Sequence, residues 1–289
     1  MLLSSNMIRL YDVFGLKETF DILADTGYEG IDFNNDKDPY STDQLDEQFY
    51  RELRQYADQK GIAICQSHAP GPSSYPEADK TEAMFKKIVQ SMKNASYLGA
   101  PMIVVHPCTH LDYMAEGNAE ILFNFNLDFY RRLIPYARAF GIKIAIENLY
   151  YSVTGTAESM NRLYDELNNP VFTICFDVGH CLLQHHYLQG DDPATAIRKI
   201  GHRLVDGCTH IHDNPGEIDA HTLPYYGKID WESVMKALAD IGYKGDFSYE
   251  ASSFFKDVPP ALRADSMTYM AKVGRYLISR FEYYQNQQA

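Results

Sequence analysis

About eight times along this chain, a helical stretch with one apolar face gives way to a glycine and then to a short apolar run. Four of these glycines, Gly27, Gly61, Gly99 and Gly141, lie 34, 38 and 42 residues apart. Glycine at these positions is typical of helix C-termini, and the apolar runs have the length and composition of buried strands. The regular alternation, without a linker or a low-complexity segment, predicts an α/β fold with a parallel sheet.

The spacing of the units favours a single (β/α)8 TIM barrel over residues 1–289. A doubly wound open sheet is the competing architecture, but no GxGxxG or GxxxxGK[ST] loop follows any predicted strand. We expect strands near 2–10, 28–33, 62–68, 102–106, 142–147, 171–177, 206–212 and 246–250. We expect helices near 17–27, 42–60, 80–98, 122–140, 157–167, 194–204 and 231–241, and a closing helix that carries Met267, Met270, Leu277 and Phe281.

Composition narrows the class of partner. A length of 289 residues and an apolar share of 45% allow a sizeable core. The formal charge of −13 argues against a nucleic-acid partner, because phosphate binding needs clustered basic residues and no basic run exceeds two residues. We therefore expect a small-molecule partner, and a homo-oligomer is compatible with the sequence.

The cysteines and the N-terminus bear on the compartment. Five scattered cysteines without a CxxC spacing predict neither a disulfide framework nor a thiolate zinc site. No run of eighteen apolar residues occurs, and the first residues lack the layout of a signal peptide. We expect a soluble, unprocessed protein in a reducing cytoplasm, without a membrane partner.

Several apolar runs end in an acid or a histidine. The active site of a barrel lies at the carboxyl ends of its strands, which is where these residues would stand. One run ends F-D-V-G-H, with Asp177 followed by His180. The group at or just past strand ends comprises His68, His106, Glu147, Asp177, His180, His210, His212, Asp213 and Glu250. Taken singly, each would be a turn or structural residue. Together they are typical of a divalent cation site for Zn²⁺, Mn²⁺, Mg²⁺ or Co²⁺, because neighbouring buried carboxylates repel one another without a cation.

The ordered motifs I-E-N-L, F-D-V-G-H, H-I-H-D-N, D-A-H-T-L-P-Y-Y-G-K-I-D-W and G-Y-K-G-D-F-S-Y-E resemble those of the xylose-isomerase-like barrel superfamily. This superfamily joins sugar and sugar-phosphate isomerases and epimerases to endonuclease IV, and the resemblance runs along nearly the whole chain. It implies one metal held by Glu147, Asp177, His210 and Glu250. It also implies that Glu147 and Glu250 move protons on the sugar, beside a carbonyl that the metal polarises, and that His180 contacts the substrate.

Two further comparisons within the superfamily follow. The ketose 3-epimerases carry an arginine six residues after the ligand histidine, where this chain has Gly216. Endonuclease IV holds three zinc ions through nine side chains, and each has a chemical match here: His68, His106, Glu147, Asp177, His180, His210, Asp219, His221 and Glu250. The resemblance therefore implies one to three ions.

Our leading hypothesis is a divalent-metal-dependent isomerase or epimerase of a small sugar or sugar phosphate, with His68, His106 and His180 binding the substrate. The alternative is a zinc-dependent phosphoesterase, an AP endonuclease of the endonuclease IV type. A barrel that only binds carbohydrate is the third reading, but it would not require both Glu147 and Glu250. We expect His212 and Asp213 to orient His210. Tyr150–Tyr151 and Phe254–Phe255 either stack on a sugar ring or pack within their loops.

Overall fold

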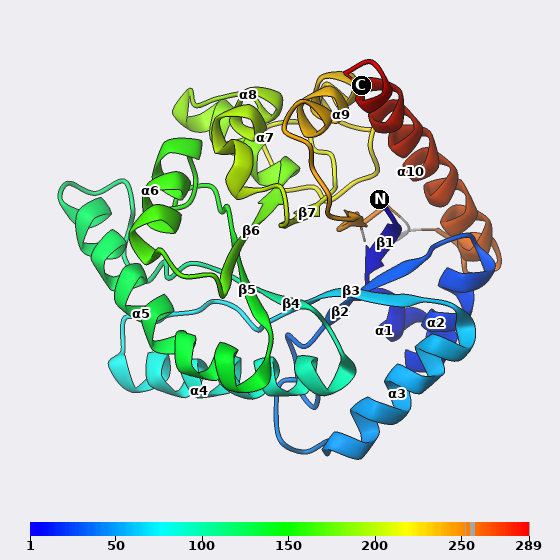
Figure 1. Ribbon diagram of the computed structural model, residues 1–289, viewed down its shortest axis with the longest axis horizontal. Coiled ribbons are helices and arrows are strands. Elements are labelled where there is room, and N and C mark those ends of the chain that lie inside the picture. The colour runs from blue at the N-terminus through cyan, green and yellow to red at the C-terminus, as the bar shows by residue number, and fades with distance from the viewer. Residues whose placement is uncertain (252, 255–257, 289) are drawn as a thin grey trace.

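The computed structural model describes residues 1–251, 253–254 and 258–288 and shows a barrel of parallel strands ringed by helices (Figure 1). The prediction of a (β/α)8 barrel is thus confirmed. Each strand pairs with its neighbours in chain order, β1 also pairs with β8, and a bridge between Ile211 and Tyr249 joins the β7 and β8 sides. The strands are β1 Leu3–Asn6, β2 Gly30–Asn34, β3 Ala63–His68, β4 Met102–Val105, β5 Lys143–Glu147, β6 Phe172–Asp177, β7 Cys208–His210 and β8 Phe247–Tyr249.

The helices pack around the outside of the barrel, and the closing helix lies against β1 and α9 (Figure 1). They are α1 Leu10–Phe14, α2 Leu16–Asp25, α3 Glu47–Lys60, α4 Ala78–Leu98, α5 Asn118–Phe140, α6 Ala157–Leu167, α7 Val178–Leu188, α8 Pro193–Ile200, α9 Trp231–Asp240 and α10 Arg263–Asn286. No helix in the described part of the chain is both long and apolar enough to cross a membrane.

Most predicted elements match to within a few residues, and the differences have local causes. The helix expected near 42–60 begins at Glu47, because the side chain of Asp46 caps it by accepting a hydrogen bond from the Phe49 amide at 2.9 Å. The helix expected to continue to 204 ends at Ile200 and is followed by a short 3₁₀ turn. Helices α1 and α7 were not predicted.

Helix α7 begins directly where β6 ends, and this junction positions part of the site. The carboxylate of Asp177 caps the helix by accepting a hydrogen bond from the His180 amide at 2.6 Å. The helix buries the polar His180 and Gln184 together with the apolar Val178 and Leu183. Because polar and apolar residues are buried together, its sequence lacks the apolar stripe on which a helix prediction depends.

The barrel has an inner and an outer apolar layer. Outward-facing strand residues such as Ile144, Ile146 and Ile174 join the main core beneath the helices. Inward-facing residues form a separate small cluster of Val104, Ala145, Cys175 and Cys208. Side chains alternate between the two faces of a strand, so the residue two positions after each inner-cluster member also faces the barrel interior.

Candidate metal centre

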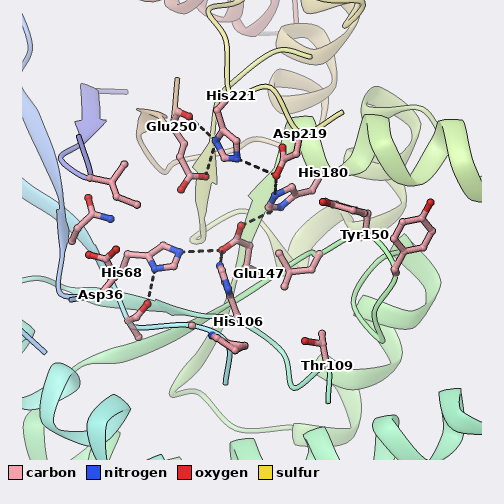
Figure 2. A pocket seen from close by; sticks show the side chains of 17 residues that line it. Asp36, His68, His106, Thr109, Glu147, Tyr150, His180, Asp219, His221 and Glu250 are labelled. Carbon is pink, nitrogen blue, oxygen red and sulfur yellow. Dashed lines mark hydrogen bonds and ion pairs between the residues drawn. The ribbon is translucent and has the colours of Figure 1, made fainter. Parts of the chain in front are cut away.

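A cavity of about 650 Å³ opens where the carboxyl ends of the strands meet (Figure 2). Strand alternation explains which side chains face the barrel interior at this end. Glu147, Asp177 and His210 follow the small inner residues Ala145, Cys175 and Cys208 by two positions. The side chains that line it include Asn34, Asp36, His68, His106, Thr109, Glu147, Tyr150, Tyr151, His180, Asp219, His221 and Glu250.

The structure brings together the four residues Glu147, Asp177, His210 and Glu250 that the resemblance implied as ligands. One ligand atom from each lies within 4.8 Å of those of the others. The Nδ1 atom of His210 lies 3.4 Å from Glu147 Oε1, 3.2 Å from Glu250 Oε2 and 3.8 Å from Asp177 Oδ2. Three of the four side chains are fully buried, and Glu250 is 9% exposed.

The atoms at the centre of this group lack ordinary hydrogen-bond partners. Within the described residues, neither carboxylate oxygen of Glu147, nor Glu250 Oε2, nor His210 Nδ1 makes a hydrogen bond. Buried carboxylates without such partners are costly, and a divalent cation bound to them removes that cost. The donor set of carboxylate and imidazole therefore fits a divalent metal ion.

Two further groups flank this centre, and both contain residues that the resemblance implied (Figure 2). On one side, Glu147 Oε2 lies 3.4 Å from His68 Nε2 and 3.0 Å from His106 Nε2. On the other side, Asp219 Oδ2 lies 3.4 Å from His180 Nε2 and 3.2 Å from His221 Nε2. All nine candidate ligands thus lie in three adjoining groups. Seven of them line the cavity, and Asp177 and His210 are fully buried within the central group.

Backbone carbonyls orient three of these histidines. The Nδ1 atoms of His68, His180 and His221 lie 2.8, 3.0 and 2.9 Å from the carbonyl oxygens of Ala69, Asn148 and Glu250. A carbonyl can only accept, so Nδ1 carries the proton and Nε2 faces the carboxylates. This is the arrangement found in metal-binding histidines.

The side chain of Asn148, in the I-E-N motif, ties the ends of β5 and β6 together. Its Oδ1 atom accepts a hydrogen bond from the Asp177 amide at 2.7 Å, and its Nδ2 atom donates to the Asp177 carbonyl at 2.8 Å. These bonds fix Asp177 relative to the neighbouring Glu147.

Neighbouring charges of opposite sign shift the pKa values of several acids and imidazoles of the site toward their ionised forms. Burial alone would raise the pKa of Glu147, but the charges of His106 and His210 hold it well below its ordinary value. Burial alone would lower the pKa of His68, but the nearby carboxylate of Glu147 raises it to about 9. At His221, burial alone would also lower the pKa, but the neighbouring Asp219 raises it to about 9.

The expected role of His212 and Asp213 is wrong. His212 Nε2 lies 3.0 Å from Asp177 Oδ1, and its ring stacks on His221 with centroids 4.0 Å apart, so it contacts Asp177 and the Asp219 group. Residues 210 and 212 face the same side because they are two positions apart. Asp213 faces the opposite side, where it accepts a hydrogen bond from Trp231 Nε1 at 2.8 Å.

Sequence reasoning missed Asp32, a fully buried acid on β2. Its Oδ2 atom lies 3.3 Å from His210 Nε2 and accepts a hydrogen bond from Gln66 Nε2 at 3.1 Å. Asp32 thus contacts the far side of the His210 ring from the central group, as carboxylates commonly do at metal-bound histidines. The available signal was an acid inside an apolar strand, at Y-E-G-I-D-F.

The aromatic residues proposed to stack on a sugar differ in their positions. Tyr150 and Tyr151 line the cavity, and the ring of Tyr150 lies 5.6 Å from that of His180. Phe254 packs instead on Tyr226 and Tyr269. Phe255 lies outside the described residues.

Comparisons with known proteins agree with this geometry. A family described as xylose isomerase-like TIM barrel matches residues 20–272. The protein y4fM of Sinorhizobium fredii is 26% identical, with 97% of this chain and 88% of that protein covered. An inosose dehydratase of Serratia proteamaculans is 23% identical, with 78% and 79% covered.

Solved structures give the same fold. The crystal structure of a D-tagatose 3-epimerase-like protein superposes with a TM-score of 0.75 at 21% identity, covering all of both chains. The structure of IolI protein with a bound zinc atom superposes with a TM-score of 0.77 at 18% identity, covering 98% of this chain and 99% of that one. The relatives and structural neighbours thus include sugar epimerases and inosose dehydratases.

Proposed function

Because the chain belongs to the xylose isomerase-like TIM barrel family, we propose that it is a divalent-metal-dependent isomerase or epimerase. Its substrate would be a small sugar, a sugar phosphate or a related hydroxycarbonyl compound. The observation that carries the proposal is the central group of Glu147, Asp177, His210 and Glu250, in which Glu147 and Glu250 line a sugar-sized cavity with carboxylate oxygens that lack hydrogen-bond partners. The inosose dehydratases among the relatives and the sugar epimerases among the structural neighbours support the class of substrate.

Glu147, Asp177, His210 and Glu250 would hold the central metal, Zn²⁺ or Mn²⁺, with Mg²⁺ or Co²⁺ as the other candidates. When bound, the ion supplies Lewis-acid polarisation of the substrate carbonyl. The flanking groups, His68–His106–Glu147 and His180–Asp219–His221, allow one or two further ions. The zinc atom in the IolI structure supports zinc as the first metal to test.

The proton transfers belong to the two glutamates. The pKa of each is held below its ordinary range, Glu147 chiefly by His106 and His210 against burial, and Glu250 chiefly by His210 against burial. Both are therefore carboxylates at neutral pH and can accept a proton from the carbon beside the carbonyl. One glutamate would remove that proton, and the other would first take up a proton from solvent and then return it on the opposite face.

The cavity walls would bind and orient the sugar. His68, His106 and His180 line the cavity and can donate to or accept from hydroxyl groups. Tyr150 and Tyr151 offer flat apolar faces for the sugar ring.

All five cysteines are free and buried, which supports the predicted cytoplasmic location.

A zinc phosphoesterase of the endonuclease IV type is the second candidate, and the grouping of all nine implied ligands favours it. The net charge of −13 counts against a nucleic-acid substrate. Among the described residues that line the cavity there is also no lysine or arginine to hold a phosphate backbone. We therefore rank it below the isomerase.

Replacing the glutamates tests the proposal. We expect Glu147→Gln and Glu250→Gln each to lower kcat by about 10²–10⁴-fold at saturating metal, because each removes a proton acceptor. Glu116→Gln, at an exposed glutamate, is the matched control and should leave kcat unchanged. Full turnover in both site variants, with folding verified by circular dichroism, would refute the proton-transfer assignment.

A further inference from the structure

Exposed large apolar side chains gather along α10 and the two segments beside it. Twelve large apolar residues of the described chain are exposed, and half of them lie on α10 or in the two segments beside it. Their exposed fractions range from 45% to 57%, and they are Tyr225, Tyr226, Leu262, Tyr269, Tyr276 and Tyr283. We call this group the α10 patch.

The spacing of the patch residues along α10 is regular. Leu262, which immediately precedes the helix, and Tyr269, Tyr276 and Tyr283 follow one another at intervals of seven residues. Seven residues make nearly two helical turns, so the four side chains form one stripe. The helix runs along the outside of the barrel (Figure 1), and its face opposite the stripe is buried through Met267, Ala271 and Ile278.

The patch joins an apolar hollow and two charged residues. A hollow of about 490 Å³ lies beside Leu262 and Tyr269 and is bounded by Phe254, Val258 and Pro259. Asp265 and Lys272 lie four residues before and three residues after Tyr269, on the same edge of the stripe. Neither forms an ion pair with any residue that the structure describes.

We propose that the α10 patch binds a second copy of this chain through an antiparallel pairing of the two α10 helices about a two-fold axis at Tyr269. In this pairing, Asp265 of each copy faces Lys272 of the other, so the same ion pair forms twice. Tyr276 of one copy falls opposite Leu262 of the other and enters its hollow. Asp265 and Lys272 carry opposite charges and lie at similar distances on either side of Tyr269. A two-fold axis at Tyr269 therefore places each of them opposite the other residue of the second copy, which identifies the partner as the same chain.

The area is sufficient for a weak dimer. A half-exposed tyrosine or leucine contributes about 100 Å² of surface, so the six patch residues from each copy bury roughly 1,200 Å² in total. This is close to the lower limit for a specific interface, and we expect a dissociation constant on the order of micromolar.

Sedimentation velocity of the full chain, from about 1 to about 100 µM, tests the pairing. We expect a species of twice the 33.0 kDa chain mass at the upper end. Asp265→Lys and Lys272→Asp should each weaken the dimer by about tenfold or more, because each places like charges opposite one another. An equimolar mixture of the two variants should dimerise again, because lysines of one chain then meet aspartates of the other.

A further variant tests the apolar contact of the α10 patch. Tyr269→Glu should abolish the dimer, whereas Tyr136→Glu, at a tyrosine of α5 that is 39% exposed, should leave it unchanged. A wild-type chain that is monomeric at about 100 µM would overturn the proposal. So would a mixture of the charge variants that associates no better than each variant alone.

Discussion

In three histidines of this cavity the two ring nitrogens have different roles. In His68, His180 and His221 the Nδ1 proton is held by a backbone carbonyl, so only Nε2 can bind a cation, and it must first be unprotonated. The acids of the site oppose the loss of the Nε2 proton. Glu147 raises the pKa of His68, and Asp219 that of His221, from 6.5 to about 9 against the effect of burial.

Metal binding should therefore release protons and strengthen with pH. The charged histidines stabilise the metal-free chain fully below about pH 6.5, and this contribution is lost as pH rises through about 9. Over the same window metal affinity should rise, because the ion no longer competes with protons. Calorimetric titration of zinc in two buffers of different ionisation enthalpy measures the protons released. An affinity that falls with pH, or binding without proton release, would contradict this account.

At the scale of residues, the candidate ligands at strand ends could be predicted from the sequence, but the residues that contact them could not. Glu147, Asp177 and Glu250 could be found because an apolar run stops at each of them. Asp32 and His212 could not be assigned, because their partners, His210 and Asp177, belong to other strands and meet them only when the barrel closes. A pattern along one strand contains no information about contacts across the barrel.

At the scale of elements, glycines end the helices at the amino end of the barrel, opposite the cavity. Gly141 has the left-handed φ of 65°, and a Cβ there would meet no atom within 4 Å. Gly141→Ala should therefore cost about 1–2 kcal/mol in the free energy of unfolding through backbone strain alone. Urea denaturation measures this loss, and metal affinity should stay unchanged.

Gly141→Asn is the matched variant, since asparagine tolerates this conformation better and should cost less than alanine. Equal stability of all three proteins would show that backbone strain is not what the glycine relieves. The regular strands and long helices could be predicted because periodicity and glycine agree there. Helix α7 could not, because it buries His180 and Gln184 with its apolar residues and shows no continuous apolar face.

At the scale of the whole molecule, the barrel brings acids and imidazoles from six strand ends together at one end, although they lie far apart in the sequence. The fold could be predicted from repetition alone. The division of the nine candidate ligands into three groups follows from the closed barrel and its loops. For example, Asp219 and His221, in the loop after β7, meet His180 on α7.

The most direct test of the central claim is exchange of substrate hydrogen with solvent. The zinc- or manganese-loaded chain is incubated in deuterium oxide with a panel of ketopentoses, ketohexoses and their phosphates. Mass spectrometry then measures deuterium at the carbon beside the carbonyl. We predict exchange into at least one sugar, lost on chelation and in Glu147→Gln/Glu250→Gln. No exchange into any sugar by a fully metal-loaded chain that cleaves abasic DNA would contradict the account.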